Sequence, residues 1–223
     1  MMRRSRIIFL ALGLALGVLV AATTATGTHS RPADDQRGEG GGHHNAFVRW
    51  DLLHAVNGVA VAGGTDVSTD STTQDTIALT GSGQFEPRQQ EAAGGGTFVH
   101  EQADGTLLAK GSYIVTGFVS WQPLKGGNFA ATGLIDGIGN GPGSSKDENE
   151  PSSGIVTLDV RLVPDGTAPS EGVDAVLSVH CNLPQTIGGD FEGFTLSFGS
   201  FAFTPTANAD PQAHGITLFH RLR

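Results

Sequence analysis

Cysteine is almost absent from the chain, since Cys181 is the only one among 223 residues. A single thiol cannot form an internal disulfide, whatever the redox state of the compartment. The protein therefore does not belong to the small disulfide-stapled class. Its stability has to come from a hydrophobic core, and a chain of this length is long enough to bury one.

Positive charge is also scarce. Lys and Arg number 13 against 22 Asp and Glu, which gives a formal net charge of −9. Binding to nucleic acid depends largely on neutralising phosphates with Lys and Arg, and adsorption to anionic lipid needs the same side chains. The composition therefore excludes nucleic acid as a partner and argues against attachment to a membrane surface.

Motifs of the common enzyme classes are missing as well. The chain has no Gly-x-Ser-x-Gly elbow, no Cys-x-x-Cys pair and no phosphate-binding glycine loop that ends in Lys-Ser or Lys-Thr. His100-Glu101 lacks the second His of a zinc-protease helix. These absences favour a non-enzymatic protein, while the question of catalysis stays open.

The N-terminus has the pattern of a secretory signal peptide. Arg3, Arg4 and Arg6 precede an apolar run from Ile7 to Ala22, which is shorter than the roughly 20 residues of a bilayer-spanning helix. Small residues near Ala22 and Ala25 offer a cleavage site, and the residues after the arginine pair favour the general secretory route over the twin-arginine route. We therefore expect a secreted protein with no stable membrane anchor once the signal is removed.

Three segments follow from this pattern: a signal peptide with a signal helix at 1–27, a polar lead at 28–45 and a folded domain at 46–223. The lead is rich in Gly, Asp, Arg and His, so it cannot bury enough apolar surface to offset chain entropy and is expected to be disordered. His43-His44 lies in this lead, where solvated linker is a simpler interpretation than a metal site.

From Ala46 onward the apolar residues recur with period two in short runs, between clusters of Gly, Asp, Pro, Asn and Ser. In Val173–Leu183, for example, every second residue from Val173 is apolar or Cys. No segment carries a convincing amphipathic helical pattern. The fold class is therefore all-β, a single antiparallel meander of about nine strands, with a barrel favoured over a two-layer sandwich because closure removes the sheet edges. The other expected strands are Phe47–His54, Val59–Ala62, Thr76–Phe85, Thr97–Gln102, Leu107–Trp121, Val156–Leu162 and Ile216–Leu222, with more in Phe191–Phe203.

Local features refine this prediction. Gly81 and Gly83 indicate strong curvature or a close backbone approach, and Asp104-Gly105 indicates a hairpin turn. The apolar parity shifts at Gly199-Ser200, which predicts a β-bulge. Gly137–Gly154 is expected to be a long mobile loop.

Several short strings, all composed of turn and strand residues, resemble a group of small secreted bacterial proteins of unassigned function. The resemblance spans most of Gln84–His220 and implies export and an all-β fold, with no catalytic residues to carry over. The strings are Gly81–Phe85, Gly94–His100, Thr116–Trp121, Ser178–Cys181, Phe191–Thr195 and Thr217–His220.

Three histidines fall on apolar parities of the expected strands: His54, His100 and His220. If the first and last strands are neighbours, the three could converge in the barrel interior, and three imidazoles are a sufficient ligand set for a catalytic zinc. The simpler interpretation is that each lies near a strand end and is hydrogen-bonded to backbone or water.

Two acidic clusters could donate oxygens to calcium, although neither has the spacing of a dedicated calcium loop. They are Asp66, Asp70 and Asp75, in an expected Thr/Ser loop, and Asp147, Glu148 and Glu150. The parity of Tyr113 and Trp121 places both with Val115 and Val119, which indicates core rather than a ligand platform.

Two hypotheses of function remain open. The first is a secreted non-enzymatic β domain that acts as a binding or structural module for an unknown extracellular ligand or protein. The second is a small β-barrel enzyme or ligand carrier with an interior histidine-lined pocket. Neither requires a resident cofactor, apart from the zinc or calcium considered above.

The leader generates a first prediction. Protein recovered outside producing cells should begin between about Thr23 and Ser30, because signal peptidase cleaves after the small residues that follow the apolar run. N-terminal sequencing of the released protein measures this directly. Released protein that still begins at Met1 would contradict the assignment.

Overall fold

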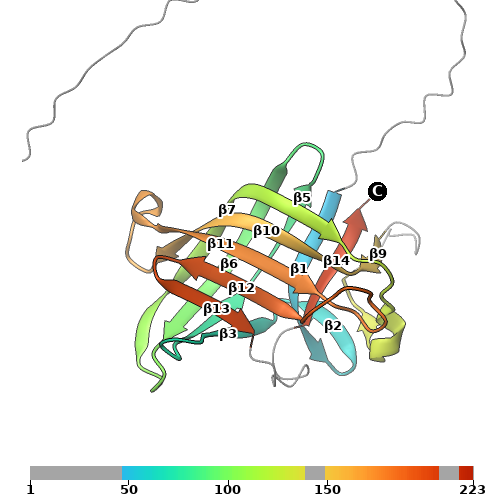
Figure 1. The fold of residues 1–223 in the computed structure, drawn as a ribbon, viewed down its shortest axis with the longest axis horizontal. Coiled ribbons are helices and arrows are strands. Elements are labelled where there is room, and N and C mark those ends of the chain that lie inside the picture. Colours follow the sequence, from blue (N-terminus) through green and yellow to red (C-terminus); the bar gives the residue numbers. More distant parts are fainter. Residues whose placement is uncertain (1–46, 139–148, 206–215, 223) are drawn as a thin grey trace, which may run out of the picture. The chain divides into compact units, whose positions relative to one another are not determined.

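Eight strands form a closed barrel in which every neighbouring pair is antiparallel (Figure 1). The computed structural model describes residues 47–138, 149–205 and 216–222. Each barrel strand pairs with the next one in the series, and β13 pairs back with β3. The all-β class and the barrel are therefore confirmed, although the chain forms an eight-stranded barrel with six outer strands rather than a single meander of about nine strands. The barrel strands are β3 (Thr65–Asp70), β4 (Thr76–Thr80), β6 (Glu91–Glu101), β7 (Leu107–Pro123), β10 (Gly154–Pro164), β11 (Val173–Cys181), β12 (Gly193–Phe198) and β13 (Phe201–Pro205).

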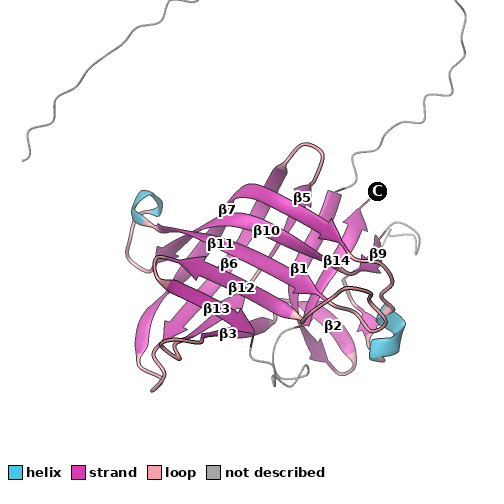
Figure 2. Cartoon of the chain, viewed as in Figure 1, coloured by secondary structure: helices cyan, strands magenta, loops and turns pink. Residues whose placement is uncertain are grey.

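Six further strands extend the sheet beyond the barrel (Figure 2). The first and last strands, β1 and β14, pair with each other in this outer part. Two short 3-10 helices, η1 (Phe129–Thr132) and η2 (Pro169–Glu171), complete the regular structure of the described residues. No helix in the described ranges is long and apolar enough to cross a membrane. The outer strands are β1 (Phe47–Val56), β2 (Val59–Ala62), β5 (Ser82–Glu86), β8 (Ile135–Asp136), β9 (Asn149–Ser152) and β14 (Ile216–Leu222), and all their pairings are antiparallel except the short parallel β2–β8 pair.

The period-two pattern determines which side chains fill the barrel. Alternate residues of β10 and β11 lie opposite one another, so Leu158 faces Leu177 and Val156 faces Val179 on the inner face. Neighbouring strands add Phe194 and Phe203, and all of these side chains are at most 1% exposed. An eight-stranded barrel is just wide enough for its side chains to fill. The interior is therefore the hydrophobic core.

The expected strand over Thr76–Phe85 is interrupted at Gly81, and its two halves have different partners. β6 pairs with β5 through its first residues and with β4 through its last. A Cβ atom on Gly81 would lie 2.1 Å from the Tyr113 hydroxyl oxygen, and one on Gly83 would lie 2.7 Å from Nε1 of Trp50. The close backbone approach predicted for these glycines is confirmed, and it is here that the outer strands diverge from the barrel.

The expected Thr/Ser loop around Asp66 and Asp70 is wrong, because these residues form β3. Asp66 lies opposite Leu79 and Ser68 lies opposite Ile77 in the ladder with β4. Since Leu79 and Ile77 belong to the core, β3 turns its acidic and hydroxyl side chains toward the barrel interior. Only residues 71–73 form a turn.

The expected β-bulge at Gly199-Ser200 is also wrong. β12 and β13 form a hairpin in which Phe198 pairs with Phe201, so Gly199 and Ser200 are its two turn residues. Gly199 has a φ of 54°, in the left-handed region that two-residue hairpin turns use. A turn and a bulge both shift side-chain parity, so parity alone could not distinguish them.

Bulges do occur in β7, and they correct the expected position of Val119. The β7–β10 ladder shifts register twice, so that Thr116 and Val119 have no partner residue in β10. Val119 is 49% exposed, whereas Tyr113 is buried and Trp121 packs against the core. The core position expected for Tyr113 and Trp121 is confirmed, and that of Val119 is not.

Several segments expected from the sequence lie wholly or partly outside the described residues. The signal peptide, the polar lead, Asp147 and Glu148 lie outside the described residues. Of the expected loop at Gly137–Gly154, the described residues include β9, which pairs with β14, and the start of β10. The hairpin turn at Asp104-Gly105 is confirmed, with the Gly105 N–H donating to the carbonyl oxygen of Gln102 at 2.8 Å.

Cys181 lies at the end of β11 on the core side, as its parity indicates. The side chain is 0% exposed, and burial raises the pKa of the thiol well above its usual value. His180, the preceding residue, stacks its ring on Phe191 at a centroid distance of 4.0 Å. The thiol therefore behaves as a small hydrophobic group of the core.

A prediction about stability follows. Cys181→Ser should lower the free energy of unfolding by roughly 1–3 kcal/mol, because the smaller and more polar hydroxyl would leave a gap at a fully buried position. Cys181→Ala should cost less than a large cavity mutation. Denaturant unfolding measures both. In the native protein the thiol should react slowly with a thiol reagent, and fast stoichiometric labelling would show that the inward assignment of this strand end is wrong.

Candidate functional site

A small pocket of about 330 Å³ lies where the end of β1, the segment after β11 and the start of β14 meet. Its volume is at the lower end of the range of small-molecule sites, about 300–1,000 Å³. Apolar side chains make up most of its wall, and Glu192 is the one ionisable residue among the described residues of that wall. The lining residues are Ala55, Thr132, Leu134, Asn182, Leu183, Pro184, Glu192 and Ile216.

The lining residues are positioned by the end of β11 and the start of β14, which lie beside the pocket. β11 stops at Cys181, and the chain continues through Asn182 to the buried Leu183, whose N–H donates to the Ser153 hydroxyl at 3.3 Å. Thr217 of β14 lies opposite Leu52 of β1 in the outer ladder and is fully buried. Glu192 precedes β12, so three segments that are distant in the sequence meet around its carboxylate.

The Glu192 carboxylate accepts hydrogen bonds from this frame. The Asn182 N–H donates to Oε2, and the Thr217 N–H donates to Oε1 at 2.7 Å. The Thr217 hydroxyl lies 2.7 Å from Oε1 and also contacts the carbonyl oxygen of His180. A hydroxyl has a single proton, so Thr217 can donate to only one of these two acceptors at a time.

Burial raises the pKa of Glu192 to about 7, against the effect of its hydrogen bonds, and the Asp66 carboxylate adds to the rise. Burial also raises the pKa of Asp66 to about 7. Within the described part of the chain, Asp66 Oδ2 has no hydrogen-bond partner. Each of these two carboxyl groups near one pocket therefore gains or loses its proton close to neutral pH. Acid–base groups of functional sites often titrate in this range.

Gly193 directly follows Glu192 and packs closely against the Asp66 carboxyl group. Its φ of 117° is a conformation that side chains disfavour, and a Cβ atom there would lie 2.7 Å from Asp66 Oδ2. Asp66 accepts the Val67 N–H at 2.8 Å through its other oxygen. Asp66 is not among the residues that line the pocket, so it raises the pKa of Glu192 without being part of the pocket wall.

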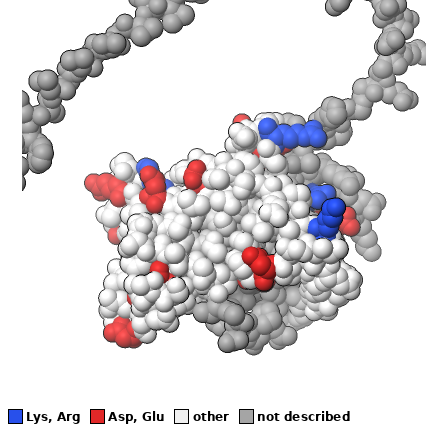
Figure 3. Space-filling view, viewed as in Figure 1, with Lys and Arg blue, Asp and Glu red and all other residues white. Residues whose placement is uncertain are grey.

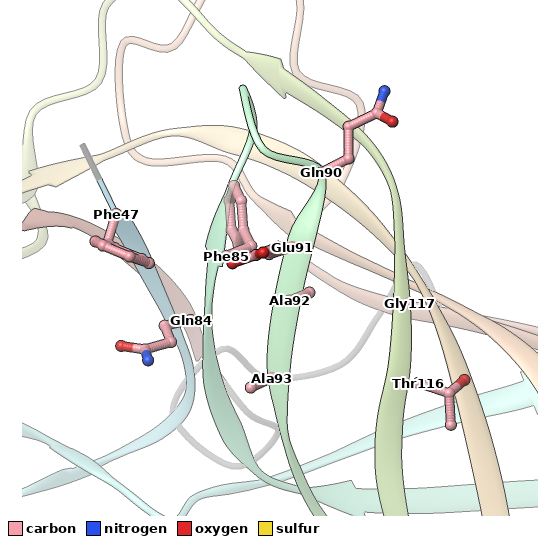
Figure 4. A pocket seen from close by; sticks show the side chains of 9 residues that line it. All are labelled: Phe47, Gln84, Phe85, Gln90, Glu91, Ala92, Ala93, Thr116 and Gly117. Carbon is pink, nitrogen blue, oxygen red and sulfur yellow. The ribbon is translucent and has the colours of Figure 1, made fainter. Parts of the chain in front are cut away.

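Two other hollows have a different character. One, of about 400 Å³, lies between the start of β1, the β5–β6 hairpin and β7 (Figure 4). The other, of about 480 Å³, lies on the outer face of β10 and β11 beside the Arg161–Asp174 ion pair at 2.6 Å. The ionisable side chains of the first hollow (Glu91) and of the second (Asp159, Arg161 and Asp174) are exposed or half-buried. The walls of both hollows are more polar than that of the Glu192 pocket, so the Glu192 pocket is the better candidate for a small-molecule site.

The three histidines expected to converge do not come together in the structure. β1 and β14 do pair, but the ladder is antiparallel, so His220 lies opposite Arg49 while Leu53 lies opposite Ile216. His54 is thus five positions further along β1, about 17 Å at 3.4 Å per residue, and it is exposed. His100 lies in β6 opposite Ile77.

His100 is part of an aromatic cluster at one end of the barrel. Its ring meets the rings of Phe198, Phe201 and Phe203 edge-on at centroid distances of 5.0 to 5.9 Å. Its Nε2 lies 3.6 Å from Asp75 Oδ2. Burial lowers the pKa of His100, and Asp75 opposes that effect. The ring is therefore a neutral packing element at pH 7.

His220 forms a second buried pair, with Asp136 of β8. The distance from Nε2 to Asp136 Oδ2 is 2.9 Å, and the imidazole is 1% exposed. Beside it, Arg49 makes two hydrogen bonds of 2.8 Å with the Asp51 carboxylate. The pair ties the short β8 to the outer sheet.

The structure brings no metal-binding group together within the described ranges. No three His, Cys, Asp or Glu side chains there are placed to hold a metal ion. Of the acidic residues considered for calcium, Asp70 accepts the N–H groups of Thr72, Thr73 and Ala202 at 2.7 to 2.9 Å. Its oxygens are thus used by the backbone. Glu150 lies in β9 and is exposed.

Sequence analysis missed Glu192 and gave Asp66 another role. Glu192 stands in Phe-Glu-Gly-Phe, where a single carboxylate next to a glycine carries no recognisable motif. Asp66 had a signal that could have been used, because Asp66, Ser68 and Asp70 alternate with Val67 and Thr69 in the manner of a strand. Because Asp66, Ser68 and Asp70 are all polar, their alternation did not indicate a strand with a buried face.

Comparison with known proteins adds no assignment. No protein-family model matches the chain, and no curated protein or solved structure matches it. The resemblance to small secreted bacterial proteins therefore stays a prediction. The pocket has to be interpreted from its own residues.

The pKa of Glu192 generates a prediction about pH and stability. Between about pH 4.5 and 7 the unfolded chain has released this proton while the folded protein keeps it, so the unfolding free energy falls as pH rises through this interval. Glu192→Gln should remove the part of that fall that comes from Glu192, about 3 kcal/mol at most, while Asp66, whose pKa is also raised to about 7, keeps its own part. Urea unfolding at pH 5, 6, 7 and 8 measures it.

The exposed Glu91→Gln is the matched control for that series. The buried His100 and His180 produce the opposite slope, because burial lowers their pKa and the unfolded chain binds protons first as pH falls. The informative quantity is therefore the difference between wild type and Glu192→Gln at each pH. A difference that does not change with pH would show that Glu192 titrates normally.

Proposed function

We propose that the protein is a secreted, non-enzymatic binding module that holds a small, mostly apolar molecule in the Glu192 pocket. One observation carries the proposal: among the described lining residues, a single partly buried carboxyl with a pKa of about 7 stands in an otherwise largely apolar wall. Pockets of this composition, with few polar groups and a perturbed pKa, are the usual form of ligand sites. Export is the part of the proposal that rests on the signal-peptide pattern alone.

The barrel supports this location of the site. Interior positions of the barrel are filled by core side chains such as Leu158, Leu177 and Phe203. A ligand is therefore better accommodated at the end of the barrel, where chain segments rather than a continuous ladder form the wall. The hypothesis of an interior histidine-lined pocket receives less support, since no histidine is among the described residues that line the Glu192 pocket.

Charge on the surface is consistent with a small-molecule ligand rather than a nucleic acid. Figure 3 shows that Lys and Arg on the face displayed are few and separate, and that they do not gather into a patch. The acidic excess of the whole chain acts in the same direction.

A titration with toluene and benzyl alcohol tests the proposal. In a methyl-labelled sample, the signals of Leu134, Leu183 and Ile216 should shift because these residues line the pocket. Ala55→Trp should weaken binding by about tenfold or more, because the indole would occupy the pocket volume. Ala103→Trp, in the exposed turn between β6 and β7, is the matched control. Shifts that Ala55→Trp leaves unchanged, or no shifts at millimolar probe, would contradict the proposal.

A further inference from the structure

The Glu192 carboxylate has hydrogen-bonding capacity that the protein does not use. A carboxylate offers about four acceptor positions. Its donors among the described residues are the Asn182 N–H on Oε2 and, on Oε1, the Thr217 N–H with the Thr217 hydroxyl. Even when Thr217 gives its proton to Glu192, Oε2 therefore keeps one position open. A donor that enters the pocket can fill it.

Among the described residues the carboxylate also lacks a countercharge. No Lys, Arg or His is among the described residues that line the pocket. The ion pairs formed within the described ranges join Arg49, His100, Arg161, His180 and His220 to aspartates, and none includes Glu192. A carboxylate withdrawn from solvent without a countercharge is costly, so a cation in the pocket would be favoured.

The other ionisable groups around Glu192 increase the need for a cation beside its carboxylate. Asp66 of β3 is acidic and raises the pKa of Glu192, and Cys181 of β11 is a buried thiol whose own pKa is raised by burial and by Glu192. His180 could offer positive charge, but burial lowers its pKa, and its Nδ1 faces Asp190 at 3.5 Å. Among the described residues, the surroundings of Glu192 thus supply no permanent cation.

We infer that the ligand of this pocket is a small hydrophobic amine, whose ammonium group donates to Glu192 Oε2 while its hydrocarbon part lies against Leu134, Leu183 and Ile216. This inference rests on the proposed function. A neutral hydroxyl would supply the missing donor but not the missing charge. A hydrated inorganic cation would find only one carboxylate in an apolar wall. The excess of acidic residues in the chain, 22 against 13, attracts cations in general.

Binding of an ammonium ion should be linked to the proton of Glu192. Below a pH of about 7 the carboxyl is mostly protonated, so the amine has to displace that proton and binds more weakly. Above that pH the carboxylate is ready for the cation. Affinity for an amine that stays protonated should therefore rise between pH 6 and pH 8, and affinity for a neutral analogue should not change.

The experiment compares benzylamine, benzyl alcohol and toluene, which share one ring and differ in the polar end. Calorimetric titrations of the full chain at pH 6 and pH 8 should give benzylamine an affinity about tenfold above that of benzyl alcohol at pH 8. Glu192→Gln should abolish this preference, while the exposed Glu150→Gln should leave it unchanged. At pH 6, titrations in buffers of different ionisation enthalpy should show release of up to one proton with benzylamine and none with benzyl alcohol.

The outcomes separate this inference from the proposed function. If benzyl alcohol and toluene bind, and benzylamine binds no better in the wild type than in Glu192→Gln, the pocket is real and the amine inference is wrong. If none of the three compounds shifts the methyl signals of Leu134 and Ile216, the proposed function itself fails. Glu192→Gln alters the hydrogen bonds that Glu192 accepts from Asn182 and Thr217, so its native state is checked by the methyl spectrum before titration.

Discussion

The pairing between β3 and β13 is the contact on which the closed barrel depends. Among the described residues three pairs form this ladder, and Phe203 lies opposite Asp70 within it. Closure places the polar face of β3 inward, so each polar group there needs a partner. The Ser68 hydroxyl donates to the Phe194 carbonyl oxygen at 2.7 Å, and Asp70 accepts three backbone N–H groups. Asp66 accepts the Val67 N–H through Oδ1, whereas its Oδ2 has no hydrogen-bond partner among the described residues, and burial raises the pKa of this carboxyl to about 7.

The glycines between β4 and β6 allow one chain to build both the barrel and the outer layer. At Gly81 the strand changes partners, and the Leu52 N–H donates to the Gly81 carbonyl oxygen at 2.9 Å. This connects β1 to the barrel and, through the β1–β14 ladder, positions Thr217 against Glu192. The geometry of the pocket thus depends on backbone contacts about as much as on the residues that line it. Side chains at Gly81 or Gly83 would separate the two layers, since each would meet Tyr113 or Trp50 at less than van der Waals distance.

Much of the fold could be predicted because burial on one face imposes period two, which the sequence carries plainly in β10, β11 and β14. The errors have physical causes. β3 carries polar side chains on its buried face, so hydrophobicity could not reveal it. The two bulges of β7 change parity twice within a few residues, which moved Val119 to the surface. The histidines were placed on apolar parities correctly for His100 and His220, but an antiparallel ladder joins opposite strand ends, so His54 and His220 could not meet. Glu192 could not be found at all, because its burial arises from three distant segments that only the fold brings together.

Glu192 and Asp70 show how the same kind of group serves two purposes. Asp70 is held by the N–H groups of Thr72, Thr73 and Ala202, which lower its pKa and keep it ionised. Such a carboxylate stabilises a turn and has little capacity left for another partner. Glu192 also accepts hydrogen bonds from the chain, but loss of solvation outweighs them, so its pKa rises to about 7 and its charged form is disfavoured in the free protein. A glutamine has a single amide oxygen and could not accept both the Asn182 and the Thr217 N–H groups, so folding itself favours a carboxyl group here. Folding does not account for the open acceptor position on Oε2 or for the missing countercharge among the described residues. The arrangement is better explained by a ligand that supplies the missing donor and the missing charge together.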